Sequence, residues 1–169
     1  FYSPQSWGVT TPQMLTTLGD KVAALGWHIQ LLARPGTLVE LAPVLRSLPV
    51  PLVIDHFGLI GSMDGVDGDA LALVRALLDD GRTWMKLSAP SIEADAGAPG
   101  REAKDAVARA LLAAAPERML WGSDWPHTVA PAGSIDDAQL VDRLRSWCAN
   151  DQQMDRILVD NPAALYGFD

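Results

Sequence analysis

Apolar and polar residues follow one another along this chain in a pattern that predicts short buried strands separated by helices. Apolar runs that stop at glycine, proline or acidic residues are typical of strands buried in a parallel sheet. Four such runs occur, at residues 27–33, 51–55 and 83–88 and from Met119 onward. Between the runs, apolar residues recur with helical spacing. This spacing predicts helices at residues 12–25, 38–47, 69–80 and 103–114.

Capping and breaking residues support these boundaries. Thr11 is expected to cap the first helix, Pro12 suits its first position, and Gly26 stops it. Residues 134–137, Ser-Ile-Asp-Asp, resemble a capping box that opens a further helix toward Cys148. Two shorter helical pieces are expected after it. The remaining segments are expected to be loops, at residues 1–10, 58–68 and 89–101.

The alternation of strands and helices also predicts the architecture. Strands that recur every roughly 25 to 35 residues with a helix between them form right-handed βαβ units and a parallel sheet. Four such units are half of a (β/α)8 TIM barrel. An open doubly wound sheet is the alternative, but the chain has no Gly-x-Gly-x-x-Gly pattern after its first strand and no Walker-type Gly-Lys-Ser/Thr run. We therefore expect an α/β fold with four βα units of a barrel.

Composition narrows the function classes. The chain has 169 residues, of which 13 are basic and 21 acidic, so its formal charge is −8. This charge argues against binding to nucleic acid and gives no reason to expect binding to anionic membranes. No apolar run is long enough to span a bilayer. Cys148 is the single cysteine, which excludes a disulfide framework and a cysteine-based zinc site within the chain. A cytoplasmic setting is expected.

The segment from Arg118 to His127 holds the leading catalytic candidate, Asp124. Its apolar run Met119–Trp121 is broken by Gly122 and Ser123, so Asp124 sits at the carboxyl end of a strand. Reacting groups converge at the carboxyl ends of the strands in α/β barrels. An ordinary turn or capping aspartate is the alternative, because aspartate is common in turns.

A second strand delivers Asp55 and His56 to the same edge. Successive strand side chains point to opposite faces, so we expect only one of the two to face into the barrel. We favour His56, because an imidazole can polarise a carbonyl, bind a metal or move a proton near neutral pH. Asp55 would then anchor the loop. A purely structural histidine is the alternative.

Four further residues are candidates for contact with a substrate. His127 and Trp125 follow Asp124 in the loop, where packing of the histidine on the tryptophan is an equal alternative. Gln30 could line the barrel. Lys86 is expected to point inward, where its ammonium group needs an acidic partner and a structural ion pair is the alternative role. His28 lies near the start of its strand and is expected to be structural.

Five segments together resemble the carboxyl-terminal half of the amidohydrolase-2 family, which includes 2-pyrone-4,6-dicarboxylate lactonases. The segments are residues 26–32, 53–58, 84–88, 118–127 and 160–168. The resemblance implies that residues 1–169 are the carboxyl-terminal half of one barrel domain and contain its last four βα units. It also implies that His56 is the active-site histidine after the sixth strand and Asp124 the aspartate after the eighth.

The chain departs from the family pattern in two places. The family's His-x-His pair on the first strand, which helps to bind a metal or the substrate, does not occur in this chain. Related lactonases carry an arginine soon after the strand at 83–88 that grips a substrate carboxylate, but no arginine follows here before Arg101. The resemblance therefore leaves open a divalent metal such as zinc, held by His56 and Asp124, or no cofactor at all. It also leaves open whether the lactone carries carboxylates.

The expected function is hydrolysis of a lactone or a related cyclic ester, with Asp124 as general base and His56 polarising the carbonyl. A metal-dependent decarboxylase of the same superfamily and a catalytically inert half-barrel are the alternatives. Four strands leave two open sheet edges. We expect the amino-terminal half of the barrel, or a second copy of this chain, to cover them, and we favour the former because the chain begins with Phe1.

Overall fold

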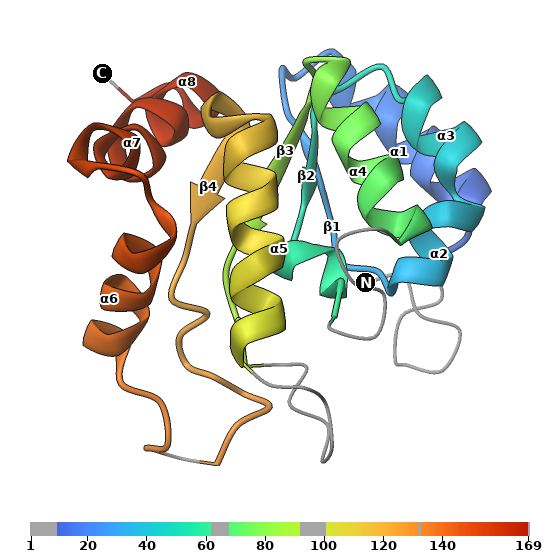
Figure 1. Ribbon diagram of the computed structural model, residues 1–169. Helices are drawn as coiled ribbons and strands as arrows, with labels where there is room; N and C mark the ends of the chain where they lie inside the picture. Colours follow the sequence, from blue (N-terminus) through green and yellow to red (C-terminus); the bar gives the residue numbers. More distant parts are fainter. Residues whose placement is uncertain (1–9, 62–67, 92–100, 132, 169) are drawn as a thin grey trace.

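A computed structural model describes residues 10–61, 68–91, 101–131 and 133–168 (Figure 1). Its centre is one parallel sheet whose strands lie side by side in chain order. The strands are β1 (Ile29–Leu31), β2 (Leu52–Ile54), β3 (Thr83–Leu87) and β4 (Met119–Trp121). This is the predicted α/β arrangement. The strand predicted at 27–33 is shorter than expected, because only three of its residues pair with β2.

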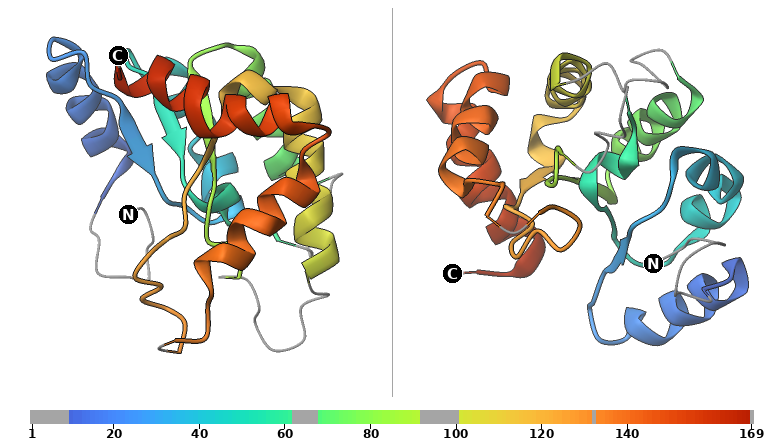
Figure 2. Two further views of the ribbon diagram at one scale, coloured as in Figure 1. Left: turned by 90° about the vertical axis from the view of Figure 1, so that its left-hand side faces the viewer. Right: turned by 90° about the horizontal axis from the view of Figure 1, so that it is seen from below.

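Helices surround the sheet, as the predicted βαβ units require. Their bounds are α1 Pro12–Ala23, α2 Pro35–Glu40, α3 Ala42–Ser47, α4 Asp69–Asp79, α5 Arg101–Ala114, α6 Asp137–Trp147, α7 Asp151–Asp155 and α8 Asn161–Tyr166. Shorter turns are the 3-10 segments η1 (His56–Leu59) and η2 (Pro116–Arg118) and the π-helical η3 (Arg156–Asp160). Seen from below in Figure 2, the helices form an arc around the strands. None of the helices in the described ranges has the length and apolar character needed to cross a membrane.

The two faces of the sheet carry different side chains. Residues that alternate along each strand pack outward into the main core beneath the helices, among them Leu31, Ile54, Met85 and Met119. The residues between them face the other way, where Val53, Trp84 and Leu120 form a small apolar cluster with Leu165 of α8. The strict alternation follows from the period of two of a β-strand.

Two predicted helix boundaries were wrong. The helix expected at 38–47 is split at Leu41 into α2 and α3, because Pro43 lacks an N–H and its ring clashes with the preceding turn. The expected capping box at Ser134 does not cap α6. Asp136 is the N-cap, and its carboxylate accepts a hydrogen bond of 2.9 Å from the Ala138 N–H.

Three segments predicted to be loops lie wholly or largely outside the described residues. They are the opening residues 1–9, residues 62–67 of the glycine-rich segment and residues 92–100 after β3.

Asn161, in the Asn-Pro sequence near the end of the chain, connects the start of α8 to the sheet by side-chain hydrogen bonds. Asn161 is 4 % exposed. Its side-chain amide donates to the carbonyls of Pro116 at 2.8 Å and Met119 at 2.7 Å. These bonds hold the start of α8 beside the start of β4. The motif that contributed to the family resemblance therefore has a structural role in this chain.

Candidate active site

Polar side chains gather on the inner face of the sheet toward the carboxyl ends of its strands. The Gln30 amide donates to Asp55 Oδ2 at 2.8 Å and accepts from Lys86 Nζ at 2.8 Å. Lys86 Nζ also lies 3.6 Å from Asp55 Oδ1. The acidic partner expected for Lys86 is thus Asp55. Gln30 belongs to β1, Asp55 directly follows β2, and Lys86 belongs to β3.

The expectation that Asp55 faces the outer helices was wrong. Asp55 has the same parity as the inward residue Val53, so it points into the polar network and is 9 % exposed. Strand parity alone would then turn His56 outward. The backbone leaves the strand at this point, because residues 56 to 59 have φ values of 49°, 57°, 63° and 50°. This left-handed turn brings the His56 side chain back to the inner face beside Asp55.

Both ring nitrogens of His56 have close polar neighbours. Nδ1 lies 2.7 Å from Ser88 Oγ and 3.3 Å from Asp55 Oδ1. Nε2 lies 3.3 Å from Asp124 Oδ1. The predicted proximity of His56 and Asp124 is confirmed, and the two residues meet from the ends of β2 and β4.

Asp124 lies in a turn that begins directly after β4. Its φ is 69°, a left-handed conformation that aspartate adopts more readily than most residues. Its carbonyl accepts a hydrogen bond of 2.8 Å from the His127 N–H. Ser123 Oγ accepts one of 3.2 Å from the Trp125 N–H. The turn thus holds the Asp124 carboxylate, whose side chain is 23 % exposed, toward His56.

The other two candidates of this loop point elsewhere. Trp125 is 75 % exposed. His127 Nε2 lies 3.0 Å from Oδ1 of Asp137, the first residue of α6. His127 thus ties the loop to α6 and is not brought into the network around His56. A substrate contact by either residue stays a prediction.

Lys86 and Asp55 of the network also act electrostatically on two rings toward the amino-terminal ends of the strands, those of His28 and Tyr166. The His28 ring packs edge-on against Tyr166, with 5.5 Å between ring centroids. Burial, assisted by the positive charge of Lys86, lowers the pKa of His28. Burial and the negative charge of Asp55 raise the pKa of Tyr166. His28 packs as expected of a structural residue, yet its charge state is linked to Lys86.

Sequence reasoning missed Ser88 as a member of the site. Ser88 is 1 % exposed and shares the inward parity of Lys86. That parity was visible in the sequence. What the sequence could not show is that Ser88 meets His56, because this contact depends on the left-handed turn.

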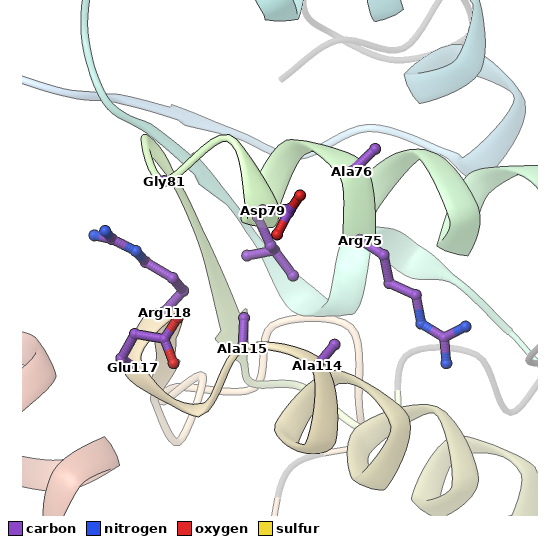
Figure 3. A pocket seen from close by; sticks show the side chains of 9 residues that line it. Arg75, Ala76, Asp79, Gly81, Ala114, Ala115, Glu117 and Arg118 are labelled. Atoms are coloured by element: carbon purple, nitrogen blue, oxygen red, sulfur yellow. The ribbon is translucent and has the colours of Figure 1, made fainter.

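A hollow elsewhere on the molecule does not contain the candidate residues. It measures about 490 Å³ and lies between the end of α4 and the end of α5 (Figure 3). Its charged lining residues are Arg75, Asp79, Glu117 and Arg118. Figure 3 shows the two arginines on opposite sides of it. Gly81 and Arg118 precede β3 and β4, so this hollow lies toward the amino-terminal ends of the strands.

The described residues of this chain do not by themselves supply the donors of a catalytic metal site. A catalytic zinc takes three protein ligands as a rule. In the parts of the chain that the structure describes, no three His, Cys, Asp or Glu side chains are grouped so that they could hold one. His56 and Asp124 supply two donors.

A family model described as Amidohydrolase matches residues 3–168. The chain belongs to the amidohydrolase family. It is 32 % identical over 165 residues to a 2-pyrone-4,6-dicarboxylate hydrolase of Comamonas testosteroni, covering 93 % of this chain and 54 % of the relative. It is 33 % identical over 145 residues to a 4-sulfomuconolactone hydrolase of Rhizobium radiobacter, covering 85 % of this chain and 48 % of the relative.

Solved amidohydrolase structures agree with this fold. An apo crystal structure from Agrobacterium tumefaciens superposes with a TM-score of 0.83 at 27 % identity, covering 96 % of this chain and 58 % of that one. A probable 2-pyrone-4,6-dicarboxylic acid hydrolase from Acinetobacter baumannii, crystallised with citric acid, gives a TM-score of 0.76 at 25 % identity and covers 95 % and 60 % of the two chains. The chain thus spans about half the length of the relatives that it matches. It corresponds to four βα units of an amidohydrolase TIM barrel.

Proposed function

We propose that the protein containing this chain hydrolyses a lactone, with Asp124 and His56 at the reaction centre. The observation that carries the proposal is their convergence, with 3.3 Å between His56 Nε2 and Asp124 Oδ1 at the carboxyl edge of the sheet. Relatives with 32 % and 33 % identity are named as hydrolases of lactone-type substrates. A carboxylate and an imidazole in contact are also the pair that water attack on an ester carbonyl requires.

In the proposed reaction, Asp124 takes a proton from water as the water oxygen attacks the lactone carbonyl. The Nε2–H of His56 donates to the carbonyl oxygen, where negative charge develops. General base catalysis contributes about 10²-fold or more, and loss of one oxyanion donor typically costs about 10²- to 10³-fold in kcat. The proton on Asp124 then passes to the alkoxide that leaves as the ring opens, so Asp124 returns to its starting state.

Lys86 and Gln30 are proposed to border the substrate. Gln30 is exposed, and the Lys86 side chain is 20 % exposed on the inner face. An ammonium group there suits a lactone with an anionic substituent, such as the carboxylates or sulfonate in the relatives' substrate names. Because Lys86 is already paired with Asp55, its pull on a substrate anion is moderated.

We also propose that the active protein contains further barrel strands. Within the described residues, β1 pairs only with β2 and β4 only with β3. Open edges of a parallel sheet leave backbone groups and apolar side chains without partners. The amino-terminal half of an amidohydrolase barrel would cover both edges.

The test is a hydrolysis assay of the full natural protein with 2-pyrone-4,6-dicarboxylate, 4-sulfomuconolactone and an uncharged lactone of similar size. Ring opening of at least one lactone, at least about 10²-fold slower in Asp124→Asn, is expected. Turnover unchanged by this variant would contradict the role of Asp124. Residues 1–169 expressed alone should be inactive, and size-exclusion chromatography should show an associated species. An active monomer of these residues would contradict the need for further strands.

A further inference from the structure

The proposed reaction needs a hydrogen on Nε2 of His56, and the structure contains a group that could put it there. We propose that Ser88 is a positioning residue that donates its hydroxyl hydrogen to His56 Nδ1 and thereby holds the neutral ring as the Nε2–H tautomer. This inference rests on the proposed function, since it explains how His56 becomes a donor at the reaction centre.

The distances around Nδ1 favour Ser88 as its donor. Ser88 Oγ lies 2.7 Å from His56 Nδ1 but 3.5 Å from Asp55 Oδ1. A hydroxyl carries one hydrogen, and an O–H bond to an acceptor at 3.5 Å is at the limit of hydrogen bonding. Of the two acceptors, the ring nitrogen is therefore the one to which the Ser88 hydroxyl can donate at an ordinary distance.

The other side of the ring supports the same tautomer. Nε2 faces a carboxylate oxygen of Asp124 at 3.3 Å. An ionised carboxylate only accepts hydrogen bonds. A hydrogen on Nε2 makes this contact favourable, whereas a lone pair on Nε2 would face the lone pairs of Asp124. In a neutral ring, the hydrogen on Nε2 leaves Nδ1 as an acceptor, which is what Ser88 requires.

Asp55 competes with Ser88 for the hydrogen-bonding role of His56 Nδ1, because it would favour a hydrogen on that nitrogen. Asp55 Oδ1 lies 3.3 Å from Nδ1 and would attract a hydrogen onto that nitrogen. In the structure this oxygen already accepts from the His56 backbone N–H at 3.2 Å and lies 3.6 Å from Lys86 Nζ. Oδ2 accepts from Gln30. Because the Asp55 oxygens already interact with these partners, Asp55 attracts the ring hydrogen less strongly. The hydrogen bond from Ser88 then determines that Nδ1 is the acceptor.

Removal of the Ser88 hydroxyl should reverse the tautomer. In Ser88→Ala, Asp55 would be the remaining acceptor beside Nδ1, and the ring hydrogen would move to Nδ1. Nε2 would then become an acceptor and could not donate to the carbonyl oxygen. Because the variant loses the donor to the carbonyl oxygen, we expect kcat to fall about 10²-fold, with little change in KM.

The experiment is ¹⁵N NMR of the histidine rings in the full natural protein at alkaline pH, where the rings are neutral. Loss of signals in His56→Gln identifies the His56 resonances. The parent should show a hydrogen on Nε2 and a bare Nδ1, and Ser88→Ala should show the hydrogen on Nδ1. Ser88→Thr keeps a hydroxyl and should restore the parent pattern. Ser47→Ala is the matched control, because its hydroxyl donates to the Val44 carbonyl on an exposed helix end, away from the network around His56.

Two results would overturn the inference: a hydrogen on Nδ1 in the parent, or identical His56 signals in the parent and in Ser88→Ala. If the alanine variant does not fold, Ser88→Cys replaces the hydroxyl by a weak donor and should give a mixture of tautomers. Unchanged His56 signals in that variant would also count against Ser88. Because the NMR signals are read without substrate, a protein that opens no lactone would refute the proposed function while leaving this result intact.

Discussion

The two faces of the same four strands differ in nearly every physical respect. The outer face is apolar and fully covered, with Ile54, Met85 and Met119 at 0 % exposure beneath the helices. The inner face carries charged and polar side chains, and its apolar cluster has three buried members among the described residues. Because strand parity separates them, one sheet can use one face for stability and the other for chemistry.

Backbone strain is distributed as unevenly as polarity. Within the described residues, the non-glycine residues with positive φ follow the carboxyl ends of strands: His56, Phe57, Leu59, Ala89, Asp124 and His127. Each such residue costs about 1 to 2 kcal/mol. The outer core holds the turn at 56–59 in place, since Phe57 is fully buried and packs edge-on against Trp147, with 5.6 Å between their centroids. The stable face thereby supports the strained edge.

The largest expected effect is the loss of stability when a large side chain of the outer core is made smaller. Leu71 in α4 is fully buried. Leu71→Ala leaves a cavity beneath the helices and should lower the free energy of unfolding by about 3 to 4 kcal/mol. Urea unfolding measures the loss. Leu18→Ala in α1, where the side chain is 47 % exposed, should cost much less. Equal losses in the two variants would break the contrast between core and surface.

Asp124→Asn should lower turnover and leave the free energy of unfolding unchanged, in contrast to the core substitution. Asparagine keeps the size of the side chain but cannot take a proton from water. We expect turnover to fall at least about 10²-fold, which corresponds to about 2.7 kcal/mol in activation free energy. The urea midpoint should be unchanged. Asp151→Asn is the control, because this carboxylate is 85 % exposed and pairs with Arg145 on the surface. A comparable loss of turnover in both variants would contradict a specific role.

Asn161→Ala should destabilise the amino-terminal end of the inner face. The substitution leaves the carbonyls of Pro116 and Met119 without the donors that they have in the structure. A buried polar group that loses its partner costs about 1 to 3 kcal/mol, and we expect about 2 kcal/mol by urea unfolding. Asn150→Ala, which removes the cap of α7, should cost about 1 kcal/mol. A larger loss at Asn150 would show that Asn161 is not the stronger anchor.

The sequence was sufficient to predict the sheet and the meeting of His56 with Asp124. Buried strands leave apolar runs, and parallel connections bring every carboxyl end to one edge. These rules need no knowledge of side-chain contacts. They placed both residues correctly even though β2 and β4 are far apart in the chain.

The parts that the sequence did not predict depend on tertiary packing. We assumed that His56 continued the strand, so we expected only one of Asp55 and His56 to face inward, whereas both side chains lie on the inner face. Only Gly58 signals a left-handed turn in that segment. Its neighbours His56, Phe57 and Leu59 adopt positive φ against their own preference, because Phe57 fills a site in the core. Pro43 did signal the break between α2 and α3, but the apolar spacing across it was given more weight.

The smallest expected effect is a change in the pKa of His28, which tests whether the charge of Lys86 acts on this ring. Burial lowers the pKa of His28, and Lys86 lowers it further. A ring whose pKa lies below its unfolded value of about 6.5 takes up its proton more readily in the unfolded chain. The stability that neutral His28 contributes is therefore complete above about pH 6.5 and is lost as the pH falls through the folded pKa.

An NMR titration of His28 in the full natural protein measures this pKa directly. The parent value should lie below the ordinary range of histidine. Lys86→Met removes the smaller of the two causes, so the pKa should rise only part of the way back, because burial against Tyr166 remains. Lys21→Met in α1 serves as the control, since Lys86 is the charge that acts on His28. A pKa of His28 that does not respond to Lys86→Met would mean that the polar network ends at Lys86 and does not reach the amino-terminal end of the sheet.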